Sequence, residues 1–268
     1  DEVAALVAAE AAPGSRVRPD VERTALFVVE RAEPFERLAG PFEVLQPEKY
    51  LADNVAVISA DDQPDPGDPE DGGPEVGAPT LVTSTVPLRV EGSSGKEEAI
   101  DLSLEAADGE FRVDNPLVDV GLPKELGEGI ELSETGVRVD VGKAPEERSP
   151  SALDHNAVLY PNIAEDTDFA VAPTPTGFET LTHLRSTEAP RTQTLNFELP
   201  QNAILKATEE GGAEVVKEGD ALMGVSPPAA LDAAGEDVPV SMSVSGDSLV
   251  LTVSPSESAQ YPIPVDPL

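Results

Sequence analysis

Residues 238–253 read VPVSMSVSGDSLVLTV, and this stretch decides the fold. Apolar side chains recur at every second position in 238–244 and again in 248–253, as they do in strands that bury one face. Between the two runs, Ser245-Gly246-Asp247 has the composition of a tight hairpin turn. The stretch therefore predicts an antiparallel β-hairpin.

The same alternation recurs along the chain from Leu81 onward. A second turn, Glu210-Gly211-Gly212, lies between two further alternating runs. Turn residues are spaced about ten residues apart, which is typical of a β-sandwich. We therefore predict an all-β protein. Further strands are expected at residues 86–90, 100–105, 109–113, 136–141, 169–172, 178–184, 194–199, 204–207 and 214–217.

An internal similarity divides this region into two parts. Residues 101–105 are followed by Leu-Pro and then by a strand that begins with glycine, and the strand at 195–199 runs into Leu199-Pro200 and is likewise followed by a strand that begins with glycine. We therefore expect two β-sandwich domains in tandem, Ig-like or jelly-roll-like, over residues 80–150 and 151–268. Strands from residues 24–58 are available to the first of these domains.

The chain before residue 80 has a different composition. Residues 1–59 combine an Ala- and Glu-rich stretch of good helix propensity with short apolar runs, so we expect a short mixed segment of helix and strand there. Residues 60–79 are rich in Pro, Gly and acidic residues and contain few apolar side chains. Such a composition cannot offset the entropy lost on ordering, and we interpret it as a flexible linker or loop.

The formal net charge of -35 is the most extreme property of the composition. Proteins that bind nucleic acids need clustered Lys and Arg to displace counterions, so we expect no nucleic-acid partner. Anionic membrane surfaces are disfavoured for the same reason. The acidic residues are spread along the chain, which favours solubility of a long extracellular polypeptide over adaptation to a saline or calcium-rich exterior.

The chain contains no Cys, which excludes disulfides, zinc–thiolate sites and cysteine nucleophiles. No apolar run reaches the roughly 20 residues that cross a bilayer, so we expect no membrane insertion. The first residues also lack the basic and apolar regions of a signal peptide. We expect either that a signal has been removed or that the chain was cut from a longer precursor.

Candidate catalytic residues are few. Glu179 and His183 fall on the same face of a predicted strand and are an acid/base pair in principle. A half-exposed sheet residue is the simpler interpretation of His183. His155 follows Asp154 in a predicted loop, where ordinary turn chemistry explains both residues. Neither a Gly-x-Ser-x-Gly nor a phosphate-binding glycine motif is present, so we expect no enzyme, no catalytic residues and no cofactor.

Calcium is the only metal that we consider as a ligand, because its protein ligands are carboxylate and carbonyl oxygens, which this acidic chain supplies. Prolines between the acidic residues of 61–71 disrupt the tight loop that an EF-hand-like site requires. Glu165-Asp166-Thr167-Asp168 is better organised, but we prefer a tight turn in which Asp166 or Asp168 binds backbone amides. We assign no metal ligand and leave calcium open. The acidic residues of 61–71 are Asp61, Asp62, Asp65, Asp68, Glu70 and Asp71.

Prolines indicate where strands end. Pro173 and Pro175 have no N–H to donate to a β-ladder, so residues 173–177 are expected to form an edge or a crossover that ends in a turn at Gly177. Residues 261–267 are expected to form an extended strand, compatible with a sheet edge and anchored by burial of Tyr261.

Several motifs are too particular for a generic β protein. Together they resemble the amino-terminal region of secreted RHS/YD-repeat proteins of the actinobacterial type, which are wall-associated and polymorphic-toxin-like. The resemblance covers at least residues 81–267. The motifs are LYPNIAEDTD at 159–168, PTPTGFE at 173–179, PPAALDAAG at 227–235, YPIPVDP at 261–267 and, earlier, YLADNVAV at 50–57, VTSTVPLR at 82–89, NPLVDV at 115–120 and LPK at 122–124.

The resemblance implies a β-rich module that precedes the YD repeats of a large secreted or wall-associated protein. Its expected partner is the downstream repeat shell or another protein surface. We expect a non-enzymatic module that acts in surface presentation, adhesion, or sealing and docking of the shell. The alternative is a calcium-dependent or carbohydrate-binding adhesive sandwich, although a chain with no Trp has few aromatic platforms for a sugar.

Overall fold

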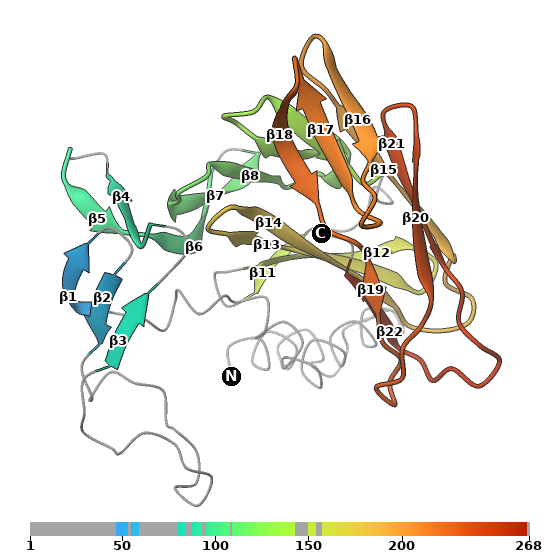
Figure 1. Ribbon diagram of the computed structural model, residues 1–268. Coiled ribbons are helices and arrows are strands. Elements are labelled where there is room, and N and C mark those ends of the chain that lie inside the picture. The colour runs from blue at the N-terminus through green and yellow to red at the C-terminus, as the bar shows by residue number, and fades with distance from the viewer. Residues whose placement is uncertain are drawn as a thin grey trace, which may run out of the picture.

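The structure, a computed structural model, describes residues 47–52, 55–58, 80–83, 87–92, 95–107, 109–142, 150–153 and 157–266. In these ranges the chain forms antiparallel β-sheets and a short 3-10 turn at Leu126–Glu128 (Figure 1). The prediction of an all-β protein of the sandwich type is confirmed. No helix in the described ranges is long and apolar enough to cross a membrane.

The larger sheet has eight strands in the order β20-β21-β15-β10-β9-β8-β7-β6. Each strand is antiparallel to its neighbours. The strands are β6 (Asp101–Ala106), β7 (Glu110–Asn115), β8 (Val120–Pro123), β9 (Ile130–Leu132), β10 (Val137–Asp140), β15 (Thr192–Glu198), β20 (Val240–Ser245) and β21 (Ser248–Val253).

The second sheet has six strands in the order β11-β12-β13-β14-β22-β19. Long hairpins of β12, β13 and β14 form its centre. The strands are β11 (Ser151–Leu153), β12 (Ala157–Ala164), β13 (Thr167–Thr174), β14 (Gly177–Leu184), β22 (Ile263–Asp266) and β19 (Ala229–Ala230).

Three small sheets complete the described structure. One is formed by β1 (Pro47–Ala52), β2 (Val55–Ile58) and β3 (Thr80–Thr83). Another pairs β4 (Arg89–Glu91) with β5 (Glu97–Ala99). The third is formed by β16 (Ala203–Ala207), β17 (Ala213–Lys217) and β18 (Asp220–Val225), and its buried side chains extend the main core.

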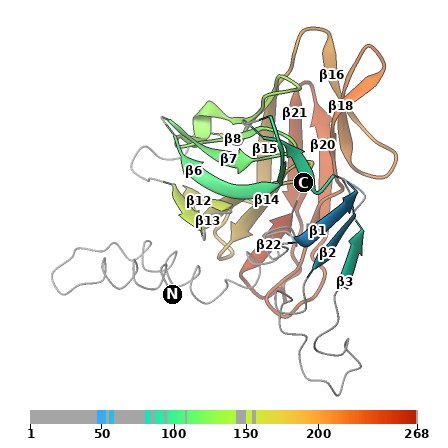
Figure 2. The same ribbon diagram turned by 90° about the vertical axis from the view of Figure 1, so that its left-hand side faces the viewer.

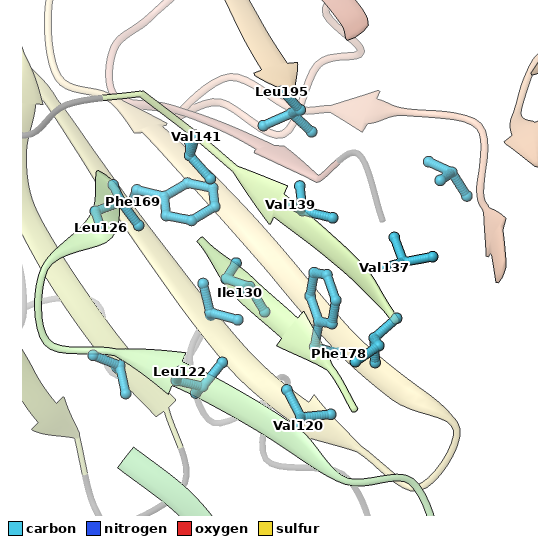
Figure 3. Close-up of a cluster of buried hydrophobic side chains, with 14 of the residues drawn as sticks. Val120, Leu122, Leu126, Ile130, Val137, Val139, Val141, Phe169, Phe178 and Leu195 are labelled. Carbon is cyan, nitrogen blue, oxygen red and sulfur yellow. The ribbon is translucent and has the colours of Figure 1, made fainter. Parts of the chain in front are cut away.

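The two large sheets form a sandwich, with β7 and β8 lying above β12 and β13 in both views (Figure 1, Figure 2). Buried side chains from both sheets make up one hydrophobic core. Figure 3 shows the ring of Phe178, from the six-stranded sheet, beside Ile130, Val137 and Val139 of the eight-stranded sheet, and the ring of Phe169 beside Leu126 and Val141. Burial of apolar surface is worth about 25 cal/mol per Å², so this layer is the main source of stability.

The hairpin predicted from residues 238–253 is confirmed. β20 pairs with β21, and Ser245 lies opposite Ser248 at the turn. Gly246 has a φ of 62°, in the left-handed region that glycine enters without strain. The predicted turn at Glu210-Gly211-Gly212 likewise joins β16 to β17.

The strands do not separate at residue 150. β10, expected in the first domain, pairs with β15, expected in the second, and Arg138 lies opposite Glu198. The hydrophobic core also contains buried residues from both parts of the chain. Residues 80–150 and 151–268 therefore share one sheet and one core, instead of forming two separate sandwiches. The reason is that alternation identifies a strand but not its partner.

The region before residue 80 is described only in part. Residues 55–58, one of the short apolar runs of the expected mixed segment, are β2, which pairs with β3. β3, at the start of the expected first domain, thus pairs with a strand from residues 24–58, which the sequence analysis gave as available to that domain. The Ala- and Glu-rich stretch expected to be helical and the linker at 60–79 lie outside the described residues.

Two proline-containing segments differ from the expectation. Thr174 lies opposite Gly177, so the predicted turn is the tip of the β13–β14 hairpin, and neither an edge nor a crossover. β22 lies between β14 and the short strand β19, so it is not an edge strand. Tyr261 packs, half-buried, against a small cluster of buried apolar side chains, in agreement with its predicted role as an anchor.

β13 is buried on both faces. Phe169 and Val171 belong to the main core, whereas Ala170 and Ala172 belong to a separate cluster with Leu181. None of these side chains is more than 7% exposed. A polar group on this part of the sheet is therefore removed from water and must find its hydrogen bonds within the protein.

Candidate functional site

The acidic tetrad Glu165-Asp166-Thr167-Asp168 spans the turn from β12 into β13. Asp166 has a φ of 46°, a left-handed conformation that Asp tolerates in turns. Asp168 is fully buried (0% exposed) and lies opposite His183 on β14. The last carboxylate of the tetrad therefore lies inside the sheet and not at the surface.

Buried Asp168 is satisfied by a backbone amide and by a guanidinium. The N–H of Asn162 donates to Asp168 Oδ1 at 2.7 Å. Nη1 of Arg185 lies 3.1 Å from Oδ1 and 3.2 Å from Oδ2. The Arg185 side chain is only 9% exposed, so the two charges form a largely desolvated ion pair.

Arg185 also ties together the ends of β12, β13 and β14. Its Nη2 donates to Oδ1 of Asn162 and lies 3.5 Å from Oδ1 of Asp166. The N–H of Arg185 donates to the carbonyl oxygen of Asp166 at 2.8 Å, and Ser186 Oγ donates to Asp166 Oδ2 at 2.6 Å. We call this set the Asp168 network. Its members are Asn162, Asp166, Asp168, His183, Arg185 and Ser186.

His183 is buried (2% exposed) and not half-exposed as we expected. Its Nδ1 lies 3.9 Å from Asp168 Oδ2. The neighbour of His183 across the sheet is thus Asp168, whereas Glu179 interacts with Asp266. The structure does not bring Glu179 and His183 together as an acid/base pair. Neither of two cavities in the described structure, of about 660 and about 280 Å³, is lined by Asp168, His183 or Arg185.

Glu179 shares a hydrogen bond with Asp266 of β22. Burial raises the pKa of Glu179 to about 7, and the neighbouring charge of Asp266 and the hydrogen bond to it act in the same direction. With a pKa of about 7, Glu179 is protonated in about half of the molecules at neutral pH. The pair joins β14 to β22.

The larger cavity, of about 660 Å³, lies between the β13–β14 turn and β18. Among the described residues that line it are Glu134 and Glu179, and none of them is a His, Lys or Arg. The described part of its wall thus supplies carboxylates and no cation to stabilise a developing negative charge. Other lining residues include Thr174, Thr176, Phe178, Leu222 and Met223.

The tetrad agrees with the preferred interpretation, a turn in which a carboxylate binds a backbone amide. The structure confirms this for Asp168, which accepts the N–H of Asn162. Within the described residues, no group of three or more His, Asp and Glu side chains is placed to hold a metal ion. Residues 61–71, Asp154 and His155 lie outside the described residues.

A second buried carboxylate organises a loop. Asp232 is 8% exposed and accepts the N–H groups of Ala234, Glu236 and Gln260 at 2.8 to 3.0 Å. The hydrogen bond from the N–H of Gln260, followed by that of Glu236, lowers the pKa of Asp232. This aspartate, from the PPAALDAAG motif, thus ties the loop after β19 to the segment before β22.

Asn162 and Arg185 were missed by reasoning from the sequence. One signal was available for Arg185: it follows His183 by two positions, and alternation places both on one face of the strand. A buried acid needs a cation, and the residue directly after β14 supplies this one. No comparable signal pointed to Asn162, which has a φ of 53° and whose side chain turns into the network.

Comparison of the chain with protein-family models, with curated protein sequences and with solved structures finds no match.

Proposed function

We propose that the chain is a non-enzymatic, β-rich module of a large secreted or wall-associated protein of the RHS/YD-repeat type. It would present the repeats at the surface, mediate adhesion, or dock against the repeat shell and seal it. Its partner would be the downstream repeat shell or another protein surface, and not nucleic acid or the interior of a membrane.

One observation carries the proposal. The most distinctive motif of the chain, residues 159–168, supplies a buried structural network, because Asp168 is 0% exposed and paired with Arg185. A binding or catalytic carboxylate needs access to its ligand, whereas a structural carboxylate needs saturated hydrogen bonds. The motif therefore supports a role as a rigid platform.

The net charge of the chain indicates which kind of partner surface it can bind. A chain of net charge -35 associates most readily with a neutral or basic surface, and attraction to a basic one weakens as salt screens it. We expect the binding face of the partner to carry more Lys and Arg than Asp and Glu. Binding at about 0.05 M salt should exceed binding at about 0.5 M, because the Debye length shortens from over 10 Å to a few ångströms.

The polypeptide encoded directly downstream of Leu268 provides the test. We expect it to contain YD repeats and, when produced separately, to co-elute with the chain and retain it in pull-downs. Purified cell wall serves as a second bait. The proposal is overturned if no such repeats are encoded, or if the chain binds neither bait while remaining folded.

A parallel measurement addresses the adhesive alternative. The melting temperature of the chain is compared in calcium, in a chelator and with soluble polysaccharides. A ligand that binds only the native state raises that temperature with concentration. Since the oxygens of Asp166 and Asp168 already bind Arg185, we expect no calcium-dependent shift from the tetrad. A saturable shift would favour the adhesive function over docking.

A further inference from the structure

One edge of the eight-stranded sheet is formed by β20 (Figure 1). An edge strand has a row of backbone N–H and C=O groups without a ladder partner, and proteins protect that row with charges, prolines, bulges or very short strands. β20 has none of these protections. It is six residues long, contains no proline and no charged residue, and pairs with β21 without a register shift.

The other edges of the two large sheets are protected. β6, at the opposite edge of the same sheet, carries Asp101 and Glu105 and has a register shift in its pairing with β7. At the edges of the six-stranded sheet, β19 has two residues and β11 has three. β20 is thus the exception in a chain in which 26% of the residues are charged.

The hydrogen bonds identify the residues of β20 that face outward. The N–H of Ser254 donates to the C=O of Pro239 at 2.8 Å, so the main chain of Pro239 faces β21. This direction alternates along an antiparallel pair, and the register then turns the main chain of the three serines of β20 toward β21. The residues whose N–H and C=O groups point away from the sheet, without a hydrogen bond among the described residues, are Val240, Met242 and Val244. We call these three residues the open edge.

The open edge begins where the pairing of the chain with itself stops. On the same outer side, the N–H of Val238 donates to the C=O of Ala230 at 2.9 Å, which closes the edge immediately before β20. β16 lies near β20 but belongs to a separate sheet and forms no ladder with it. The half-buried side chains of Met242 and Val244 pack against the main core. A strand added here therefore extends an apolar layer that already exists.

Carboxylates lie at both ends of the open edge. Glu236 and Asp237 precede β20, Asp247 lies in the turn that follows it, and all three residues are exposed. No Lys or Arg in the described part of the chain forms an ion pair with them. A strand that lies along β20 and carries Lys or Arg near its ends is attracted by both groups of carboxylates.

We propose that β20 binds an extended segment of a partner protein by β-strand addition. The segment has apolar residues at alternate positions, whose main chain pairs with the open edge, and a Lys or Arg near each end. This inference deepens the proposed docking function and rests on it for the natural partner, which is the repeat shell or another protein surface.

A second copy of the chain fits this edge less well. When two β20 strands pair antiparallel, the turn of one copy, with Asp247, comes to the start of the strand of the other copy, beside Glu236 and Asp237. Like charges then meet at both ends, and each copy carries a net charge of -35. The charges therefore favour a basic segment over self-association.

The test uses the full chain and a capped nine-residue peptide, with a Lys at each end and alternating Thr and Val between them. Binding is measured by fluorescence anisotropy and by amide hydrogen exchange, in about 0.05 M salt. We expect one peptide to bind, to slow exchange at Met242 and Val244 by at least about tenfold, and to leave Ser241 and Ser243 nearly unchanged. This alternation distinguishes strand addition from packing of the peptide on a face of the sheet.

Modified peptides separate the two sources of affinity. Methylation of the Val nitrogens removes the donors that face β20 and should weaken binding by at least about tenfold. Methylation of the Thr nitrogens, which point away from β20, is the matched control and should change affinity by less than about threefold. Glu in place of both terminal Lys should weaken binding by about tenfold, because like charges then face each other.

One pair of variants tests the edge from the side of the protein. Met242→Pro removes the central outward N–H without removing a hydrogen bond to β21, and it should abolish peptide binding. Met242→Ala loses similar packing but keeps the N–H, and it should bind the peptide within about threefold of the original chain. The two methylated peptides decide the question on the unchanged chain if Met242→Pro does not fold.

The inference is overturned if folded Met242→Pro binds as tightly as Met242→Ala, or if the two methylated peptides bind equally well. It is also overturned if sedimentation shows that the chain self-associates through β20 and excludes the peptide. If the peptide does not bind but the polypeptide encoded downstream does, strand addition at β20 is wrong and the docking function stands. Binding of the peptide without YD repeats downstream has the opposite meaning.

Discussion

Asp168 and Arg185 form a buried ion pair. Replacing one of the two residues by an uncharged residue leaves the charge of the other buried without its partner. Breaking such a pair typically destabilises a protein by about 3–5 kcal/mol. We expect Arg185→Met to lower the free energy of unfolding by that amount, measured by urea denaturation. The matched control is Arg138→Met: Arg138 pairs with Glu131 at 2.9 Å, but both side chains are 40% exposed, and the loss should stay below about 1 kcal/mol.

A double-mutant cycle separates the interaction energy of the ion pair from the contribution of side-chain packing. Asp168→Asn together with Arg185→Met removes both charges, so its effect should be smaller than the sum of the two single effects. Equal losses for Arg185→Met and Arg138→Met would contradict the importance of the Asp168 network.

Glu179 gives stability an unusual pH dependence. Its folded pKa of about 7 lies above the ordinary value of about 4.3 for Glu, so the folded state binds the proton more tightly than the unfolded state does. The stabilisation from the protonated form is full below the unfolded pKa and is lost as pH rises through about 7. Above that pH a charged Glu179 beside Asp266 is unfavourable.

Glu179→Gln should therefore stabilise the protein at pH 8 and leave it nearly unchanged at pH 4. Glu179 is only half-buried, and after allowing for solvent screening we expect a gain on the order of 1–2 kcal/mol in the free energy of unfolding at pH 8. Glu105→Gln, on an exposed position of β6, is the control. The same effect of Glu179→Gln at both pH values would contradict the raised pKa.

At the scale of elements, the β20–β21 hairpin depends on the conformation of one glycine. Gly246 has a φ of 62°, where an added Cβ is strained by roughly 1–2 kcal/mol. We expect Gly246→Ala to lower the free energy of unfolding by about 1 kcal/mol. Gly224→Ala, at an exposed strand position where an added Cβ meets no atom within 4 Å, should change it by less than about 0.5 kcal/mol.

If both glycine substitutions have the same effect, the turn conformation does not limit the stability of the hairpin. Chemical denaturation of the two variants under identical conditions makes the comparison. Amide exchange of β20 and β21 should increase selectively in Gly246→Ala, because the loss is local to the hairpin.

Sequence patterns predicted elements well where one face is buried. β21 alternates buried and half-buried side chains, as residues 248–253 indicated. β13 was predicted only at 169–172, because a strand buried on both faces shows no alternation and reads as an apolar run. The tetrad Glu165-Asp166-Thr167-Asp168 was therefore interpreted as a turn, although Thr167 and Asp168 are the first two residues of that strand.

Local sequence patterns did not predict which strands pair with each other. β10 and β15 each alternate correctly, yet nothing in either strand specifies that Arg138 faces Glu198. Likewise, the approach of Arg185 to Asp168 depends on the β13–β14 register and on the turn before it. Sequence reasoning thus predicted which segments are strands, and not how the strands order themselves.

For the whole molecule, the shared core predicts that neither half of the chain folds alone. A chain cut between residues 150 and 151 separates β10 from β15 and Ile130 from Phe169. We expect residues 151–268 produced alone to lack cooperative thermal unfolding and dispersed amide resonances. Co-production with residues 1–150 should restore both, because the two parts supply one core.

A fragment 151–268 that melts cooperatively at the temperature of the intact chain would show that the second half is an independent domain. In that case the β10–β15 ladder would be an interface between two folded units. Circular dichroism and calorimetry of the fragment, the mixture and the intact chain distinguish the two outcomes.

The β10–β15 ladder also limits how fast the chain folds. Arg138 and Glu198 are 60 residues apart, so their strands meet only after a long loop has closed. Folds dominated by such non-local pairs reach the native state in milliseconds to seconds, far more slowly than helical bundles. During synthesis β10 is made first and has an open edge until β15 follows. For that interval, the charged side chains of Arg138 and Asp140 are its protection against pairing with another chain.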